Sequence, residues 1–148
     1  MAKVLDHVCI LVKDIDKAIE HYKNIISACV PEMTDQKVEK YEAFAGGDRY
    51  YSALFEAHGD GCSIQLMQPI NTESALYKRL EKHGEHIHHL AFSPTKLGEI
   101  LNRLKENGVT LRSDELIFDA GNPDLRWNWI MPQYANGALI EIVGNVGE

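Results

Sequence analysis

Two pairs of residues in this chain combine side-chain types that could bind a metal ion. His7 is followed 58 residues later by Gln65, and His89 is followed 52 residues later by Glu141, each residue in a strand-like segment. Two imidazoles, an amide oxygen and a carboxylate suit a borderline divalent ion such as cobalt, zinc, nickel or manganese, with two octahedral positions left open. A substrate oxygen could take an open position. The metal would then stabilise a developing enolate as a Lewis acid while a nearby carboxylate removes the proton beside a carbonyl.

The letters around these four positions echo each other. The segment DHV at 6–8 is similar to HHL at 88–90, and SIQL at 63–66 is similar to LIEI at 139–142. Self-similarity at about half the chain length predicts two copies of one structural unit. A single histidine at a strand start is more often a hydrogen-bonded structural residue than a ligand, but four positions related by a repeat favour one shared metal site.

Strand alternation predicts which side chains accompany the candidates. Cys9 and Leu11 would share the face of His7, so the surroundings of that imidazole would be largely apolar. A polar group buried there without a partner costs about 1–3 kcal/mol, so each candidate needs one. Of the two adjacent histidines, the repeat selects His89 and leaves His88 on the other face.

The remaining histidines and Cys9 have less specific readings. The positions of His21, His58 and His83, on a helix or in loops, favour exposure to solvent. His86 lies at a strand entrance, and the sequence leaves its role open. Cys9 is interpreted as a small buried apolar side chain rather than a reactive thiol.

The first half of the chain predicts a strand, a helix and three further strands. Residues 4–12 form a short apolar and β-branched run, after which Asp14 is a suitable helix N-cap. Apolar residues then recur at three- and four-residue spacing up to Ile26, which is typical of a helix with one buried face. Strands are expected after it, between glycine-containing turns, near 37–44, 50–56 and 62–68.

The second half predicts the same order of elements. A connecting helix at about 72–83 ends before Gly84, and a strand follows at 87–93. Ser93 and Pro94 are expected to be the N-cap and first residue of the next helix, which Gly108 closes. Strands follow near 110–111, 116–118, 126–131 and 138–143. Residues 1–148 are therefore predicted to form one domain of two modules, at about 1–70 and 85–148.

Composition narrows the classes of function. The 148 residues are 45% hydrophobic, which is ample for a globular core. A formal charge of -7 disfavours a general electrostatic grip on nucleic acid or anionic membrane. No apolar run approaches the roughly 18 residues that cross a bilayer, and the N-terminus reads as a strand rather than a signal peptide. Three cysteines without a C-x-x-C pattern argue against a disulfide framework, so a reducing cytoplasm is expected.

The chain resembles the vicinal oxygen chelate (glyoxalase/bleomycin resistance/dioxygenase) superfamily over nearly its whole length, and methylmalonyl-CoA epimerases most of all. The resemblance is carried by LDHV at 5–8 with VKDIDKA at 12–18, by the central segment 73–92, and by the ending from Met131-Pro132 to GALIEI at 137–142. It implies an α+β fold in which two βαβββ modules form an incomplete mixed β-barrel around a metal. It implies the same four ligands, His7, Gln65, His89 and Glu141.

The resemblance also implies an activity, the epimerisation of a 2-methylmalonyl-CoA-type thioester, and a homodimer. The family reaction inverts the carbon between a thioester and a carboxylate, with one acid/base on each face of a planar enolate. One of these is the ligand glutamate, here Glu141. The other family glutamate falls where this chain reads AGGDRY at 45–50, and Asp48 is the nearest carboxylate. The segment 119–129 departs from the family pattern and adds Trp127 and Trp129, whose roles stay open.

Three other functions are compatible with parts of this pattern. A glyoxalase I-type lactoylglutathione lyase would use the same metal and proton transfer on a hemithioacetal. A dioxygenase is less favoured, because such sites resemble two histidines and one carboxylate around iron and Gln65 would be a surplus ligand. A ligand-sequestering resistance protein would trap a planar compound in a cavity lined by Trp127 and Trp129, usually without metal ligands.

Overall fold

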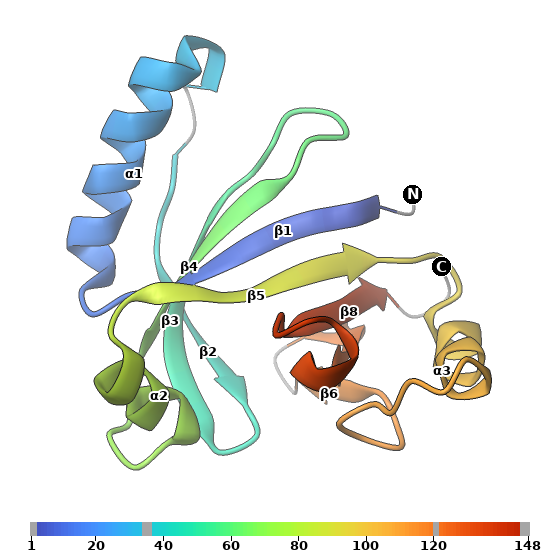
Figure 1. The fold of residues 1–148 in the computed structure, drawn as a ribbon. Helices are drawn as coiled ribbons and strands as arrows, with labels where there is room; N and C mark the ends of the chain where they lie inside the picture. The colour runs from blue at the N-terminus through green and yellow to red at the C-terminus, as the bar shows by residue number, and fades with distance from the viewer. Residues whose placement is uncertain (1–2, 34–36, 120–121, 146–148) are drawn as a thin grey trace. The chain divides into compact units, whose positions relative to one another are not determined.

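The computed structural model describes residues 3–33, 37–119 and 122–145. These residues form three α-helices and eight β-strands (Figure 1). The chain divides into two compact units, one of Cys9–Ile87 and one of Met1–Val8 with His88–Glu148. None of the helices in the described ranges is both long enough and apolar enough to cross a membrane.

The unit of Cys9–Ile87 has its strands in the order β2-β3-β4-β1, and β3 is antiparallel to both β2 and β4. Its elements are the end of β1 (Lys3–Leu11), α1 (Ile15–Cys29), the 3-10 turn η1 (Pro31–Met33), β2 (Tyr41–Ala45), β3 (Asp48–Phe55), β4 (Ser63–Pro69) and α2 (Ala75–His83). Its core joins one face of α1 to β3 and β4 through a group of buried side chains that includes Ile15, Ala18, Ile19, Ala53, Phe55 and Leu66.

The helices of this unit follow local signals in the sequence. The side chain of Asp14 accepts a hydrogen bond from the backbone N–H of Lys17, as an N-cap should, which confirms the predicted start of α1. Ser74 caps α2 in the same way, through the N–H of Tyr77, so this helix begins a few residues later than predicted. It ends before Gly84, as predicted.

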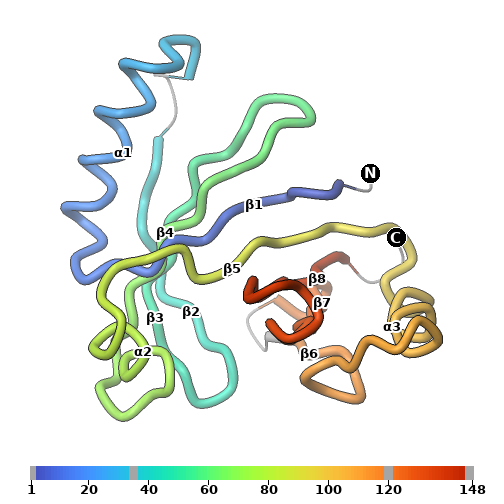
Figure 2. Tube along the Cα trace, in the orientation of Figure 1, coloured from blue at the N-terminus to red at the C-terminus, as the bar shows by residue number. Residues whose placement is uncertain are grey.

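The unit of Met1–Val8 with His88–Glu148 has its strands in the order β1-β5-β8-β7-β6. β5 and β8 are parallel, whereas β7 is antiparallel to both of its neighbours, so the sheet is mixed. Figure 2 shows β1 and β5 running side by side, as the strand order requires. The elements are the start of β1, β5 (His86–Ser93), α3 (Leu97–Glu106), β6 (Ile117–Asp119), β7 (Asn122–Ile130), the 3-10 turn η2 (Pro132–Tyr134) and β8 (Ile140–Asn145).

The core of this unit lies between α3 and the sheet. It is built on four buried side chains, Leu97, Leu111, Ile130 and Ile142. The expected α+β class with a mixed sheet is confirmed, and so is the order of strand, helix and strands in each half. The short strand expected near 110–111 is reduced to a single β-bridge between Leu111 and Ile130.

The predicted start of α3 at Ser93 and Pro94 is wrong. Ser93 is the last residue of β5, and the helix begins only at Leu97. Lys96 takes the N-cap position with φ 53 and makes no side-chain cap hydrogen bond. Its left-handed backbone separates Pro94 from the helix, so the local Ser-Pro signal does not operate. The other end is as predicted, with Gly108 following the C-cap at φ 79.

Candidate metal centre

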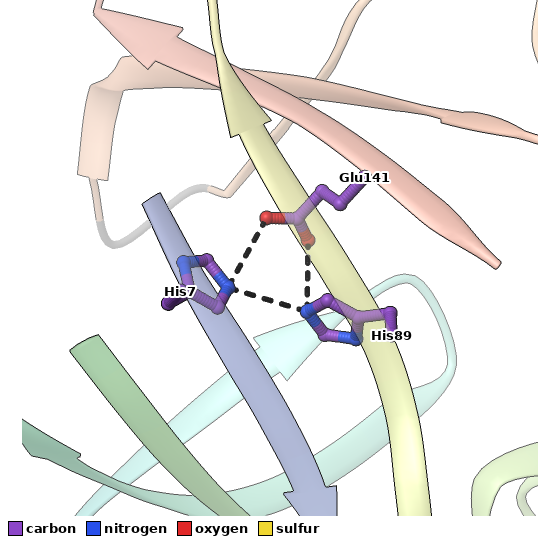
Figure 3. A group of neighbouring side chains, drawn as sticks. All are labelled: His7, His89 and Glu141. Atoms are coloured by element: carbon purple, nitrogen blue, oxygen red, sulfur yellow. Dashed lines mark hydrogen bonds and ion pairs between the residues drawn. The ribbon is translucent and has the colours of Figure 1, made fainter. Parts of the chain in front are cut away.

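Three of the predicted ligands converge in the unit of Met1–Val8 with His88–Glu148. Figure 3 shows the side chains of His7, His89 and Glu141 pointing toward one another from β1, β5 and β8. The Nε2 atoms of the two histidines are 3.3 Å apart. Oε1 of Glu141 lies 3.7 Å from Nε2 of His7, and Oε2 lies 3.8 Å from Nε2 of His89. One potential ligand atom from each residue lies within 4.8 Å of the others.

The strand pairing explains this convergence. β5 and β8 are parallel neighbours in which Ala91 lies opposite Glu141. Residues opposite each other project to the same face of a sheet, and so do residues two apart on one strand. His89, two residues before Ala91, therefore shares the face of Glu141, and β1 brings His7 from the other side of β5 in the strand order.

The site is poorly hydrated. The side chain of His89 is 3% exposed, and those of His7 and Glu141 are each 13% exposed. Loss of hydration raises the pKa of Glu141 from its usual 4.5 to about 7; proximity to His7 opposes this rise and the charge of Asp6 adds to it. In the metal-free protein Glu141 can therefore exchange a proton near neutral pH.

Each histidine of the group has a second ring contact on Nδ1, made by the residue that precedes it. Nδ1 of His7 lies 2.9 Å from Oδ2 of Asp6. This hydrogen bond holds the pKa of the Asp6 carboxyl below its usual value, against the effect of partial burial. Nδ1 of His89 lies 2.8 Å from Nδ1 of His88.

The donor set fits a divalent cation. An ionised Asp6 can only accept, so Nδ1 of His7 donates to it, and a neutral His7 ring then presents a lone pair at Nε2. That lone pair faces Nε2 of His89 and a carboxylate oxygen of Glu141. Two nitrogen ligands held about 2.1 Å from one ion lie about 3.0–3.4 Å apart, close to the separation of the two Nε2 atoms. His7, His89 and Glu141 could together hold such an ion.

The other two predicted site residues lie in the unit of Cys9–Ile87. Gln65 is in β4, and its amide Nε2 donates to the hydroxyl of Ser52 at 3.0 Å. This leaves its amide oxygen as the atom that would bind a metal. Asp48 is the first residue of β3, opposite Ala45 in the hairpin with β2. The roles of Gln65 as a ligand and Asp48 as an acid/base remain predictions.

His86 has a structural role in the same unit. Its Nδ1 lies 2.7 Å from the carbonyl oxygen of Gly84, and its Nε2 accepts from Nε of Arg79. Both ring nitrogens are thus occupied at the end of α2. Cys9 is fully buried in an apolar cluster, which confirms the prediction that it is a core residue.

The sequence reasoning did not anticipate the contacts of Asp6, His88 and Trp129. The ring of Trp129 stands edge-on to that of His89, with centroids 5.0 Å apart, and lies 6.2 Å from the ring of His88. One signal was present, since Asp6 and His88 occupy matching places in the two copies of the repeat.

Comparison with known proteins gives one family and one recurring activity. Residues 6–122 match the model of the Glyoxalase/Bleomycin resistance protein/Dioxygenase superfamily. The chain is 27% identical over 144 residues to the uncharacterized protein YqjC of Bacillus subtilis, covering 97% of this chain and 94% of that protein. It is 26% identical over 140 residues to the human mitochondrial methylmalonyl-CoA epimerase, covering 93% of this chain and 72% of that protein.

Methylmalonyl-CoA epimerases are also found among the similar solved structures. The methylmalonyl-CoA epimerase of Mycobacterium tuberculosis is 34% identical and superposes with a TM-score of 0.73, over 95% of this chain and 86% of that one. The enzyme of Streptomyces coelicolor, in complex with 2-nitronate-propionyl-CoA, shares the fold with a TM-score of 0.70 at 23% identity, over 99% of this chain and 97% of that one.

Proposed function

Because the chain belongs to the Glyoxalase/Bleomycin resistance protein/Dioxygenase superfamily, we propose that it performs the proton chemistry of an epimerase from that superfamily. The substrate would be a 2-methylmalonyl-CoA-type thioester. The observation that carries this proposal is Glu141, a nearly buried carboxylate whose oxygens lie 3.7 and 3.8 Å from the Nε2 atoms of two histidines. Such a group can take a proton from carbon and return one at neutral pH.

The metal-binding role falls to His7, His89 and Glu141, with Gln65 as the proposed fourth ligand. When bound, a divalent ion would act as a Lewis acid on the thioester oxygen as negative charge develops there. Cobalt, zinc, nickel and manganese all suit two imidazoles with oxygen donors. Support for the three-residue group comes from its geometry, and support for Gln65 comes from the repeat and the family resemblance.

The proton transfers fall to two carboxylates. A carboxylate has two oxygens, so one oxygen of Glu141 could hold the ion while the other removes the proton alpha to the carbonyl. Without a bound ion, burial raises the pKa of Glu141 to about 7, whereas a bound divalent ion would favour the ionised form that removes the proton. Inversion requires that a proton be delivered to the opposite face, and we assign this step to Asp48 on the basis of its place at the start of β3, the third strand of the first module.

The substrate proposal draws on the relatives. Methylmalonyl-CoA epimerases recur among them, and the Streptomyces coelicolor enzyme is in complex with an acyl-CoA compound. A coenzyme A thioester is therefore the proposed small-molecule partner.

By the same resemblance we propose a homodimer, which light scattering of the purified protein would test.

The deciding experiment is incubation of the metal-loaded protein with one epimer of methylmalonyl-CoA in deuterated water. We expect inversion of the alpha carbon together with incorporation of solvent deuterium there. A fully metal-loaded protein that produces neither would overturn the proposal. A parallel assay with the hemithioacetal of methylglyoxal and glutathione tests the glyoxalase alternative, which predicts turnover of that substrate and none of the thioester.

A further inference from the structure

We propose that Asp6 and His88 are positioning residues of the metal centre. Each accepts the Nδ1 proton of the ligand histidine that follows it in the chain, so that both ligands present Nε2 to the ion. This inference rests on the metal site of the proposed function and adds the outer hydrogen bonds that orient its two imidazoles.

In the hydrogen bond between Asp6 and His7, the histidine must be the donor. Oδ2 of Asp6 lies 2.9 Å from Nδ1 of His7, and an ionised carboxylate accepts but does not donate. The Asp6 side chain is 37% exposed whereas that of His7 is 13% exposed, so the pair reaches from the surface into the site. Histidines that bind metals almost always donate their other ring N–H to an acceptor such as a carboxylate, a backbone carbonyl or water, which fixes the tautomer and the ring orientation.

The contact of His88 with His89 follows from the same requirement. Nε2 of His89 faces His7 and Glu141, so metal binding needs a lone pair on that atom. The proton of the neutral His89 ring must then be on Nδ1, which lies 2.8 Å from Nδ1 of His88. His88 therefore accepts this hydrogen bond through Nδ1 and carries its own proton on Nε2.

The two partners differ in charge, and this difference predicts unequal contributions. The bond from His7 to Asp6 ends on a carboxylate, and charge-assisted hydrogen bonds are roughly twice as strong as neutral ones. The bond from His89 to His88 joins two neutral rings. The ring of Trp129 stands edge-on to both of these histidines, with centroids 6.2 Å from that of His88 and 5.0 Å from that of His89, and this packing should offset part of the difference.

The test uses the Co²⁺-substituted full-length protein. Nε2 coordination leaves an exchangeable Nδ1–H on each ligand histidine, so the wild type should show two hyperfine-shifted proton signals in H₂O that vanish in D₂O. Asp6→Ala and His88→Ala should each weaken Co²⁺ binding about 10- to 100-fold and speed the exchange of one of the two signals. The effect should be larger for Asp6→Ala.

Two further sets of variants separate hydrogen bonding from other effects. Asp6→Asn and His88→Asn keep an acceptor oxygen near the original acceptor atom, so they should recover most of the lost affinity. Asp16→Ala removes a surface carboxylate that pairs with Lys40, and His21→Ala removes an exposed histidine on α1. Neither control should alter the two signals or the Co²⁺ affinity.

Three results would overturn the inference. One is wild-type affinity and unchanged proton exchange in both alanine variants. Another is asparagine variants that fold, by circular dichroism, yet bind as weakly as the alanine variants, which also decides the matter if an alanine variant does not fold. The third is a wild type that binds no Co²⁺ at all, and only this result would overturn the proposed metal site as well.

Discussion

Trp129 lies directly opposite Glu141 in the antiparallel pair of β7 and β8, and its ring stands edge-on to His89 at a centroid distance of 5.0 Å. One indole therefore borders two of the three residues that could hold a metal. Because opposite residues share a face of the sheet, Trp129 forms part of the surroundings that keep Glu141 out of water.

We expect Trp129→Ala to weaken both the fold and the metal site. Truncation of a partly buried tryptophan should cost about 2–4 kcal/mol of unfolding free energy and admit water beside His89. Trp129→Phe keeps an aromatic edge and should retain most of the metal affinity. Urea unfolding and metal titration measure the two effects. Phe118→Ala is a control, because that aromatic residue of β6 is 60% exposed, and equal effects at both positions would contradict the assignment.

The ligand set predicts the metal content of single variants. His89→Ala and Glu141→Ala should each lose stoichiometric metal, because two remaining strong ligands hold a divalent ion poorly. Elemental analysis of the purified proteins beside wild type would show this. His58→Ala, in an exposed loop, should keep the metal. Full metal occupancy in both variants would show that His89 and Glu141 are not metal ligands.

Gln65→Ala tests the fourth ligand separately. Replacement of a neutral amide oxygen should reduce the affinity without abolishing it, since the two imidazoles and the carboxylate remain. Competition with a chelator of known affinity is the appropriate measurement. A Gln65→Ala protein with wild-type affinity would restrict the ligand set to His7, His89 and Glu141.

The raised pKa of Glu141 predicts a pH-dependent stability of the metal-free protein. The folded carboxyl titrates at about 7 and the unfolded one at 4.5, so the folded state binds the proton more tightly. Its contribution is fully present below pH 4.5 and is lost as the pH rises to 7, by about 3 kcal/mol.

Glu141→Gln removes this titration, so its stability relative to wild type should increase over that pH window. Urea unfolding at pH 5 and pH 8, with a chelator present, gives the comparison. Added metal should stabilise the wild type at pH 8 more than the Gln variant, because the amide oxygen that replaces the carboxylate is a neutral and weaker ligand. If the unfolding free energies of the two proteins changed with pH in parallel, the titration of Glu141 would not be the cause of the pH-dependent stability.

Asp48→Asn tests the second acid/base. Loss of a general acid/base should lower kcat for epimerisation about 10²- to 10⁴-fold while the metal content stays unchanged. One epimer should still exchange its alpha proton with deuterium through Glu141, without inversion, whereas the other should become inert. Asp60→Asn, at an exposed turn of the same unit, is the matched control. Normal inversion by Asp48→Asn would exclude this residue from the reaction.

The elements of the fold were predictable where their signals are local. The start of α1 depends on Asp14 and on apolar residues in the next turns, all of which are near neighbours in sequence. The start of α3 was not predictable from Ser93 and Pro94, because the left-handed backbone of Lys96 intervenes. Nothing in the identity of a lysine indicates that conformation.

The sequence by itself determined which four residues are candidate donors of a metal site. Strand alternation and the internal repeat depend only on order along the chain, and they selected His7, Gln65, His89 and Glu141, of which the structure brings His7, His89 and Glu141 together. The tertiary structure decided what surrounds these donors. The pKa of Glu141 depends on burial, and the contact of His88 with His89 depends on how two neighbouring rings turn toward each other, although alternation directs them to opposite faces. Periodicity carries no information about ring rotation or hydration, because both are set by side chains that only the folded chain brings together.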